Sequence, residues 1–260
     1  MDTNTSVDLL QHSNSIMALH MAQVGKQDEL LLSSGYDGLL CVWDVRTLRG
    51  TRPHLFGRFK TDGAAHINRS GLGPPRCEIL CLEYDRVKRV IFTGGNDCTV
   101  KVWSFNTYDL LGRHSGHHEP VTCLALDGNF LFSGSEDTSV RIWDAVPAPP
   151  HGTSYAACPF SGGTHLKSLC CHTGTVTGLA VSQLSGHLLS CASDGLVLFW
   201  DYVAGKVVRK IEHRDELSCM ALRPDVSEVL VGTRSNNVLR FPAGEAVRVK
   251  GKTGREGHAR

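Results

Sequence analysis

The sequence predicts an all-β fold built from a repeated antiparallel sheet, and three observations lead to that prediction. Short runs alternate apolar and polar residues between turns rich in Gly and Asp, as half-buried strands do. No segment of the chain has a sustained helical period. A hairpin-like stretch, FLFSGSEDTSVRIWD at residues 130–144, also recurs along the chain, and such recurrence is the signature of a repeat architecture.

The recurring stretches follow a regular spacing. Four of them end at Trp43, Trp103, Trp143 and Trp200, and a degenerate copy, VLVGTRSNNVLRF, ends at Phe241. The gaps between these end points are 60, 40, 57 and 41 residues, so two gaps match a period near 40 and two carry an insertion. The expected repeats cover residues 7–44, 77–104, 116–144, 171–201 and 212–241, and the expected insertions cover residues 60–75 and 146–163.

The four units that end in Trp carry the same marker residues at the same spacing. An Asp lies six residues before the closing Trp, a small hydroxylated residue lies ten before it, and in most units a His precedes the first strand. The markers are His12, Ser33, Asp37 and Trp43; Thr93, Asp97 and Trp103; His117, Ser133, Asp137 and Trp143; and His172, Ser190, Asp194 and Trp200. The second unit has Pro75 at the His position, so the long loop before it is expected to supply the missing contact.

Units that open with His or Gly-His and close with Trp-Asp resemble WD40 repeats, and the resemblance covers about residues 10–250. It implies an all-β WD40 β-propeller with five recognisable four-stranded blades, as a single domain over residues 1–260. It leaves open whether the ring closes or belongs to a larger propeller, because residues 7–11 and 246–250 both resemble the outer strand of the fifth blade.

The resemblance also implies that the His, Ser or Thr, Asp and Trp markers form a buried hydrogen-bond network that braces each blade. The physics agrees, because a buried carboxylate needs hydrogen-bond donors. A Ser/His/Asp set would also suit nucleophilic catalysis. A catalytic triad is needed once, whereas this set recurs with similar spacing, so the sequence favours bracing over catalysis.

No other residues point to an enzyme, a metal site or a cofactor. The chain has no unrepeated acid–base pair, no phosphate-binding loop and no CxxC motif. Cys81, Cys123 and Cys219 share one repeat position, which indicates a site for a small apolar side chain rather than a ligand. We therefore expect a non-enzymatic protein without cofactor, metal or small-molecule substrate.

Composition narrows the class of partner and the compartment. The formal net charge of +1 argues against a broad basic surface for nucleic acid, and only the basic tail at residues 248–260 favours an RNA-associated scaffold. The first residues have no basic region and no long apolar core, so we expect no secretory leader, and no apolar run reaches the roughly 18 residues that span a bilayer. Ten cysteines without a leader indicate reduced thiols and a cytoplasmic location, with the cytoskeleton, cilium and nucleus as alternatives.

By the same resemblance, partners are expected on the rim formed by the loops before the inner strands. The candidate residues precede the turn Asp or follow the marker His, and they are Tyr36, Asn96, Glu136, Ser193, Arg234, His118, Glu119, Arg214 and Asp215. Their mixed polar character suits a peptide or protein surface and favours a scaffold of a multiprotein complex. The third repeat is similar to repeats of ciliary and flagellar WD-repeat proteins, which adds the cilium to that prediction.

A sharper motif gives the alternative function. Residues 43–46, WDVR, resemble the WDxR box of propellers that recruit substrates to cullin-4 RING ubiquitin ligases. In that family the Arg lies on the surface that faces the ligase adaptor, which makes Arg46 the candidate contact. The alternative prediction is therefore a substrate receptor of such a ligase.

Overall fold

The fold is all-β throughout the part of the chain that the structure describes. The structure is a computed structural model, and it describes residues 11–23, 29–44, 55–60 (backbone only), 77–145, 163–182, 185–223 and 228–242. These residues contain no helix, and so none that is long and apolar enough to cross a membrane.

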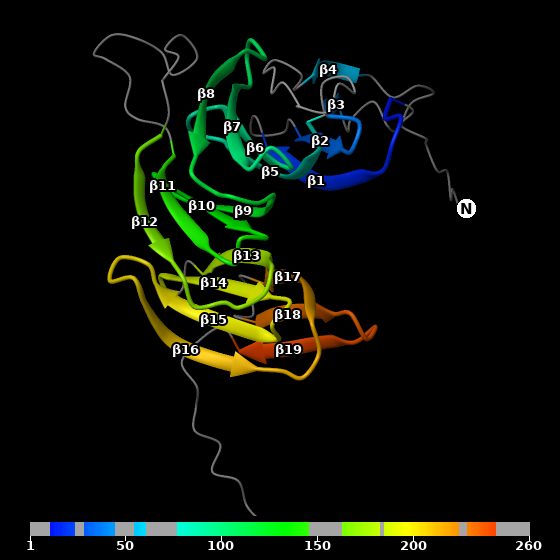
Figure 1. The fold of residues 1–260 in the computed structure, drawn as a ribbon. Helices are drawn as coiled ribbons and strands as arrows, with labels where there is room; N and C mark the ends of the chain where they lie inside the picture. The colour runs from blue at the N-terminus through cyan, green and yellow to red at the C-terminus, as the bar shows by residue number, and fades with distance from the viewer. Residues whose placement is uncertain are drawn as a thin grey trace, which may run out of the picture.

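The strands form five antiparallel sheets, the blades, which follow one another along the chain (Figure 1). Blades 1 and 2 consist of β1 (Ile16–Gln23), β2 (Glu29–Gly35), β3 (Leu39–Asp44) and β4 (Leu55–Lys60), then β5 (Ile79–Asp85), β6 (Val90–Gly95), β7 (Thr99–Ser104) and β8 (Leu110–Ser115). Blades 3 and 4 consist of β9 (Val121–Asp127), β10 (Phe130–Ser135), β11 (Val140–Asp144) and β12 (His165–Leu169), then β13 (Val176–Ser182), β14 (His187–Ala192), β15 (Leu196–Asp201) and β16 (Lys206–Glu212). Blade 5 consists of β17 (Leu217–Arg223), β18 (Glu228–Thr233) and β19 (Val238–Pro242). The repeated sheets confirm the propeller arrangement that the sequence predicts.

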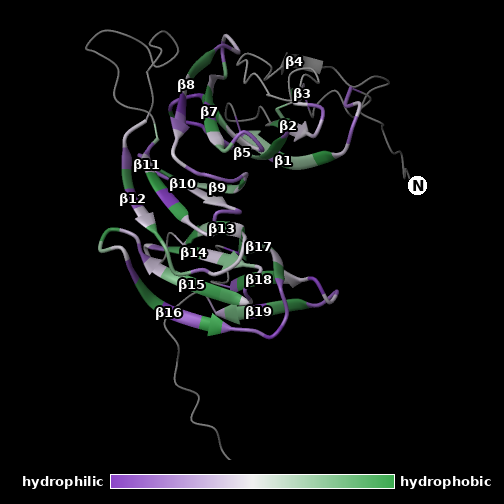
Figure 2. Ribbon diagram, viewed as in Figure 1, coloured by the Kyte–Doolittle hydropathy of each residue, from purple (hydrophilic) through white to green (hydrophobic). Residues whose placement is uncertain are grey.

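The core lies between the faces of successive blades. Because side chains alternate along a strand, each central strand contributes to two different interfaces. In blade 3, Leu131 and Trp143 pack against Phe92 and Val102 of blade 2, while Phe132 on the opposite face packs toward blade 4. Blades 1 and 2 and blades 4 and 5 share similar clusters. Figure 2 shows hydrophobic stretches concentrated in the strands, with hydrophilic turns between them.

The described blades form an open arc rather than a closed ring (Figure 1). Among the described residues, hydrophobic clusters join each blade to the next, but none joins blade 5 to blade 1. On β1, Leu19 and Met21 are 63% and 53% exposed, whereas Leu124 and Leu179, which occupy the position of Leu19 in blades 3 and 4, are 6% and 9% exposed. The face of β1 turned away from blade 2 therefore lacks the cover that a preceding blade gives elsewhere.

Blade 5 differs from the others at the end of the arc. It has three described strands, and the segments expected to compete for its outer edge, residues 7–11 and 246–250, lie outside the described residues except for Gln11, which is not in a strand. Arg240 replaces the buried Ile142 and Phe199 of earlier blades and forms an ion pair with Glu228, Nε to Oε1 3.0 Å. Cys219 is exposed, unlike the buried Cys81 and Cys123 at the same repeat position, because none of the described blades covers this face.

The inner strands carry one pair of titratable side chains that does not repeat. His20 and Glu83 occupy equivalent positions on β1 and β5, where blades 3, 4 and 5 have Ala125, Ala180 and Ala221. The His20 Nδ1 and Glu83 Oε2 atoms lie 3.6 Å apart across the interface of blades 1 and 2. Burial raises the pKa of Glu83 to about 7, although a hydrogen bond from the Tyr84 backbone opposes the shift, and burial lowers the pKa of His20.

Replacing Glu83 with glutamine is expected to stabilise the protein relative to wild type as the pH rises. Because the pKa of Glu83 is higher in the folded protein, between about pH 4.5 and 7 the folded state keeps a proton that the unfolded state has lost. The free energy of unfolding of the wild type therefore decreases as the pH rises through this range. The glutamine variant lacks this loss, and the difference should grow by about 2 kcal/mol between pH 5 and pH 8. Urea unfolding at four pH values measures it, with exposed Glu136→Gln as the control. A pH-independent difference would contradict the prediction.

Candidate functional site

The marker residues of blade 3 form one continuous hydrogen-bond chain. Trp143 Nε1 donates to Ser133 Oγ at 2.8 Å, and Ser133 Oγ lies 2.7 Å from His117 Nε2. His117 Nδ1 lies 2.8 Å from Asp137 Oδ2. These hydrogen bonds run from β11 through β10 to the loop before β9, and from there to the turn between β10 and β11. They therefore tie the β10–β11 hairpin to the loop that leads into the inner strand.

The donors fix the tautomer of His117. An indole N–H can only donate, so Ser133 Oγ accepts from Trp143 and turns its own proton toward His117 Nε2. His117 Nδ1 then carries the ring proton and donates to Asp137. Burial lowers the pKa of His117, with Asp137 opposing the shift, and this favours the neutral ring that the chain requires.

Blades 1 and 4 repeat this arrangement almost unchanged. In blade 1, the ring of His12 lies 2.8 Å from Ser33 Oγ through Nε2 and 3.0 Å from Asp37 Oδ2 through Nδ1, and Trp43 donates to Ser33 at 2.8 Å. In blade 4 the same contacts measure 2.7 Å from His172 to Ser190, 3.1 Å from His172 to Asp194 and 2.8 Å from Trp200 to Ser190. The structure thus brings together all twelve of these sequence-predicted residues.

The three carboxylates of these networks are held ionised. Burial alone would raise the pKa of Asp137, but hydrogen bonds from Ser139 and His117 outweigh it and the pKa is lowered. The pKa of Asp194 and that of Asp37 are lowered in the same way, mainly by backbone N–H donors that overcome the burial of the carboxyl. Each Asp also accepts a backbone N–H two residues later, which closes the turn.

These sets have the connectivity of a catalytic triad but cannot act as one. Ser133 and Ser190 are fully buried, and each hydroxyl oxygen accepts from a Trp indole while its proton faces a His ring. No substrate carbonyl can approach such an oxygen. Their chemistry is structural: they fix the rim loops at one end of the blade.

Blade 2 uses a different brace for its carboxylate. Lys101 Nζ lies 2.7 Å from Asp97 Oδ2, and the two side chains are 5% and 14% exposed. Thr93 Oγ1 accepts from Trp103 Nε1 at 2.9 Å, as the serines do elsewhere. Sequence reasoning missed Lys101 and assigned this role to the loop before Cys77, of which residues 61–76 lie outside the described residues. The available signal was a lysine two residues before the closing Trp and four after the turn Asp.

Replacing Lys101 with methionine is expected to lower the free energy of unfolding by about 3 kcal/mol, because it leaves a buried carboxylate without its cation. Adding Asp97→Asn to that variant should restore part of the loss, since the unpaired charge is then gone. Thermal and urea unfolding measure both variants. Lys210→Met is the matched control, because that lysine is 51% exposed and its pair with Glu212 contributes little. Equal losses at the two lysines would rule out this brace.

Blade 5 has no such network. Ser235 stands at the turn Asp position, Val231 at the hydroxyl position and Phe241 at the Trp position. His213 remains, but its Nδ1 accepts the backbone N–H of Asp215 at 3.1 Å instead of reaching across the blade. The rim of blade 5 is held by exposed contacts, such as the ion pair of Arg234 Nη1 with Glu216 Oε2 at 2.7 Å.

We call the edge of the blades where the marker His and Asp residues lie the His–Asp rim. The predicted partner-binding residues lie on this rim, at equivalent positions in successive blades. In every blade, the residue before the turn Asp position donates its backbone N–H to a carbonyl of the loop before the inner strand. The pairs are Tyr36 to Ser15, Asn96 to Glu78, Glu136 to Pro120, Ser193 to Thr175 and Arg234 to Glu216, at 2.9–3.3 Å. His118 and Glu119 are exposed in the blade 3 loop, and Arg214 is exposed in that of blade 5, where Asp215 is half-buried.

The charge of the His–Asp rim varies along the arc. Burial raises the pKa of Cys98, and the neighbouring carboxylates of Glu119, Asp97, Asp137 and Glu136 raise it further. Glu119 and Glu136 are exposed, so the sector between blades 2 and 3 presents negative charge to solvent. At blade 5, Arg214 and Arg234 stand beside Asp215 and Glu216, and the two signs alternate.

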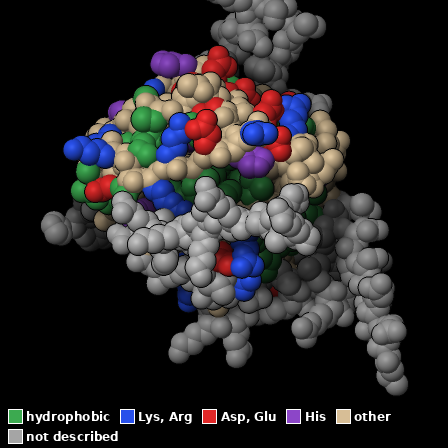
Figure 3. Space-filling view, turned by 90° about the horizontal axis from the view of Figure 1, so that it is seen from below, with side chains coloured by type: hydrophobic (Ala, Val, Ile, Leu, Met, Phe, Trp, Pro, Cys, Tyr) green, Lys and Arg blue, Asp and Glu red, His purple; other side chains and the backbone are tan. Residues whose placement is uncertain are grey.

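Several predicted features lie outside the described residues. These are Arg46, the interiors of the two insertions and the basic tail. Within the described ranges, no group of three or more His, Cys, Asp or Glu side chains is arranged to hold a metal ion. Figure 3 shows Lys and Arg side chains interspersed with Asp and Glu on the face that it presents, rather than one continuous basic surface.

Comparison with known proteins identifies the repeat. The model of the family "WD domain, G-beta repeat" matches residues 4–44, 72–104, 108–144 and 163–201, which together make up more than half of the chain. The degenerate fifth blade is outside the match. A crystal structure of the computationally designed Ika4 protein is similar in fold, with a TM-score of 0.51 and 28% identity over 64% of this chain and 91% of that chain.

Curated relatives share the repeat within longer proteins. Mitochondrial division protein 1 of Schizosaccharomyces pombe is 32% identical over 52% of this chain and 21% of its own length. The DENN domain and WD repeat-containing protein SCD1 of Arabidopsis thaliana is 22% identical over 94% of this chain and 18% of its own length. The LST8 homologue of Drosophila melanogaster is 25% identical over 78% of this chain and 56% of its own length. The chain thus spans about a fifth of the first two relatives, and the repeats, the braced blades and the family match together show that it belongs to the WD40 repeat family.

Proposed function

We propose that this chain is a non-enzymatic scaffold that binds other proteins of a multiprotein complex through the His–Asp rim. The observation that carries the proposal is the set of equivalent backbone hydrogen bonds that hold one rim residue of each blade in place. In blade 3 a buried network fixes these positions while the side chains of Glu136 and Glu119 remain exposed. Such pre-organisation lowers the entropic cost of binding, which is what a recognition surface needs.

The sector between blades 2 and 3 is the part of the rim with the clearest chemistry. Exposed Glu119 and Glu136 lie beside the ionised Asp137, so this sector suits a basic segment of a partner. Charge complementarity of this kind speeds association and selects among partners. A cytoplasmic location is part of the proposal, because Cys170, Cys171 and Cys219 are exposed free thiols, as a reducing compartment favours.

Affinity capture with quantitative mass spectrometry tests this function. Wild type is compared with the double variant Glu119→Lys/Glu136→Lys and with Glu212→Lys, a control on the outer strand of blade 4 whose side chain is 75% exposed. We expect a defined set of partners to be depleted at least about tenfold by the rim variant and retained by the control. Partner lists that are the same for all three proteins would refute the rim as the binding surface.

The WDVR sequence of residues 43–46 favours a second candidate, a substrate receptor of a cullin-4 RING ubiquitin ligase. Trp43 and Asp44 end β3, and Arg46 follows outside the described residues. Capture with wild type and Arg46→Ala separates the two functions. Recovery of a cullin-4 adaptor with wild type and its loss with the substitution would favour the receptor, whereas an unchanged list without a ligase would exclude it.

A further inference from the structure

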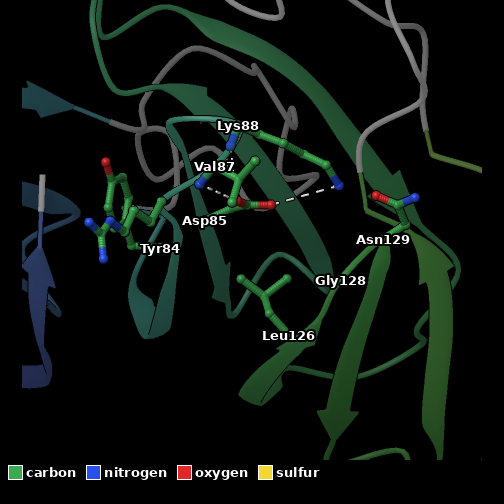
Figure 4. A pocket seen from close by; sticks show the side chains of 8 residues that line it. Tyr84, Asp85, Val87, Lys88, Leu126, Gly128 and Asn129 are labelled. Atoms are coloured by element: carbon green, nitrogen blue, oxygen red, sulfur yellow. Dashed lines mark hydrogen bonds and ion pairs between the residues drawn. The ribbon is translucent and has the colours of Figure 1, made fainter.

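A pocket with a volume of about 290 Å³ lies between blades 2 and 3 on the opposite rim, the edge that carries the turns between first and second strands. Its walls are the turn at residues 84–88 of blade 2 and, from blade 3, Leu126, Gly128 and Asn129 (Figure 4). The marker networks do not reach this edge of the blades, and neither repeat pattern nor composition pointed to it.

The pocket contains a buried cation without a hydrogen-bond acceptor. Lys88 is 8% exposed, and its Nζ has no hydrogen-bond partner in the described chain. The nearest carboxylate oxygen, Asp85 Oδ2, lies 3.7 Å away, beyond hydrogen-bonding distance. Asp85 is held by the turn itself, because its Oδ1 accepts the backbone N–H of Val87 at 2.8 Å and of Lys88 at 3.0 Å. Three ammonium donors thus remain unused, and leaving them so is costly at a buried site.

The charge and size of the pocket define what would satisfy Lys88. The turn at residues 85–89 carries three cations against one carboxylate, so an anion is favoured over a neutral group. In Figure 4 the Lys88 side chain extends along the pocket wall toward Asn129, which is exposed, and Leu126 supplies an apolar surface. The volume is at the lower end of the roughly 300–1,000 Å³ of ligand pockets, which suits one side chain or chain end rather than a nucleotide.

The neighbouring Asp85 distinguishes between anions. The Asp85 carboxylate lies 3.7 Å from the Lys88 ammonium, which the ligand would also contact. The second negative charge of a phosphate would therefore be repelled by Asp85 at short distance. A carboxylate carries only one charge, so it meets less repulsion from Asp85 while it accepts hydrogen bonds from the Lys88 ammonium.

We propose that this pocket binds a carboxylate group of a protein partner, either an Asp or Glu side chain or a C-terminus, with Lys88 as the charge partner. The proposal rests on the scaffold function but uses the rim opposite to the one assigned to it. The scaffold would then contact basic and acidic segments on its two rims.

NMR titration of the ¹⁵N-labelled full chain tests the site through the backbone amides of Lys88, Gly128 and Asn129. Four probes are used: acetyl-Ala-Ala-Leu-Glu-amide, acetyl-Ala-Ala-Leu-Ala with a free C-terminus, acetyl-Ala-Ala-Leu-Gln-amide and inorganic phosphate. At least one carboxylate peptide should bind about tenfold more tightly than the glutamine peptide and phosphate, and the tighter of the two identifies the source of the carboxylate. Lys88→Met should abolish this preference, while Arg214→Met on the His–Asp rim should keep it.

The outcomes separate this site from the scaffold function. Equal binding of the glutamine peptide, tighter binding of phosphate, or an unchanged preference in Lys88→Met would overturn the carboxylate site. If Lys88→Met does not fold, the variant Asn129→Asp tests the site instead, because Asn129 is exposed and its replacement should not disturb folding. The added negative charge at the pocket should weaken carboxylate binding at least about tenfold. The capture experiment depends on Glu119 and Glu136 instead, so the rim function stands or falls independently.

Discussion

Replacing Asp137 with alanine is expected to lower the free energy of unfolding by about 3 kcal/mol. The carboxylate accepts hydrogen bonds from His117 Nδ1 at 2.8 Å and from Ser139 Oγ at 2.6 Å, and it also accepts the backbone N–H of His118 and of Ser139. Alanine removes the acceptor that all four donors share, and the His117 and Ser139 side chains are buried. Urea-induced unfolding at pH 7 measures the loss.

Ser235→Ala is the matched control, because Ser235 occupies the position of the turn Asp in blade 5 and is exposed. Its hydroxyl donates to Asp215 at 2.6 Å on the surface, so the loss should stay under about 1 kcal/mol. Similar losses in the two variants would show that the buried network does not stabilise the blade more than a surface contact does.

The same network predicts an acid dependence. The pKa of Asp137 is lowered in the folded protein, so the stabilisation is complete above the ordinary pKa of about 3.9 and is lost as the pH falls through the lowered value. The difference between wild type and Asp137→Ala should therefore shrink below about pH 4. A difference that stays constant down to pH 2 would contradict an ionised carboxylate as the acceptor.

Replacing Gly195 with alanine should cost at least about 3 kcal/mol. Gly195 has a φ of +80°, and a Cβ built there would lie 2.3 Å from the backbone oxygen of His213. The neighbouring chain cannot move away easily, because the His213 N–H donates to the Gly195 carbonyl at 2.8 Å. The overlap therefore disturbs the connection between blades 4 and 5, and both thermal and urea unfolding should show it.

Gly186→Ala separates the contact from the backbone conformation. Gly186 has a similar φ of +65°, but nothing lies within 4 Å of the position that a Cβ would occupy there. This variant should lose only the roughly 1 kcal/mol that a left-handed conformation costs a residue with a side chain. If the two variants lose the same stability, the close approach to His213 is not the reason for glycine at position 195.

The blade networks could be predicted because they depend on spacing within one repeat. Ser133 and Trp143 lie on adjacent strands of one hairpin, and the alternation of side chains brings them to the same face. The same strand register brings His117, in the loop before the first strand, within hydrogen-bond distance of Asp137 in the turn. Such short-range geometry is repeated in every unit that keeps the residues, so one sequence contains several copies of the same signal.

Lys101 and Glu83 show why the rest could not be predicted in the same way. Lys101 replaces a histidine that lies in a different part of the repeat, so the marker pattern of the other blades does not point to it. Glu83 is one strand residue among many in the sequence. Its altered pKa arises from burial beside β1, in the interface that contains His20, 63 residues away in the chain.

The sequence by itself determined the all-β class, the repeat family, the blades and the residues of their networks, because these follow from side-chain alternation and from spacing inside a unit of about 40 residues. Only the tertiary structure decided the open arc, the exposure of Cys219 and the pocket around Lys88. These features depend on how one blade packs against the next. Contacts between blades bring together residues from separate repeats, and no spacing within a repeat encodes them.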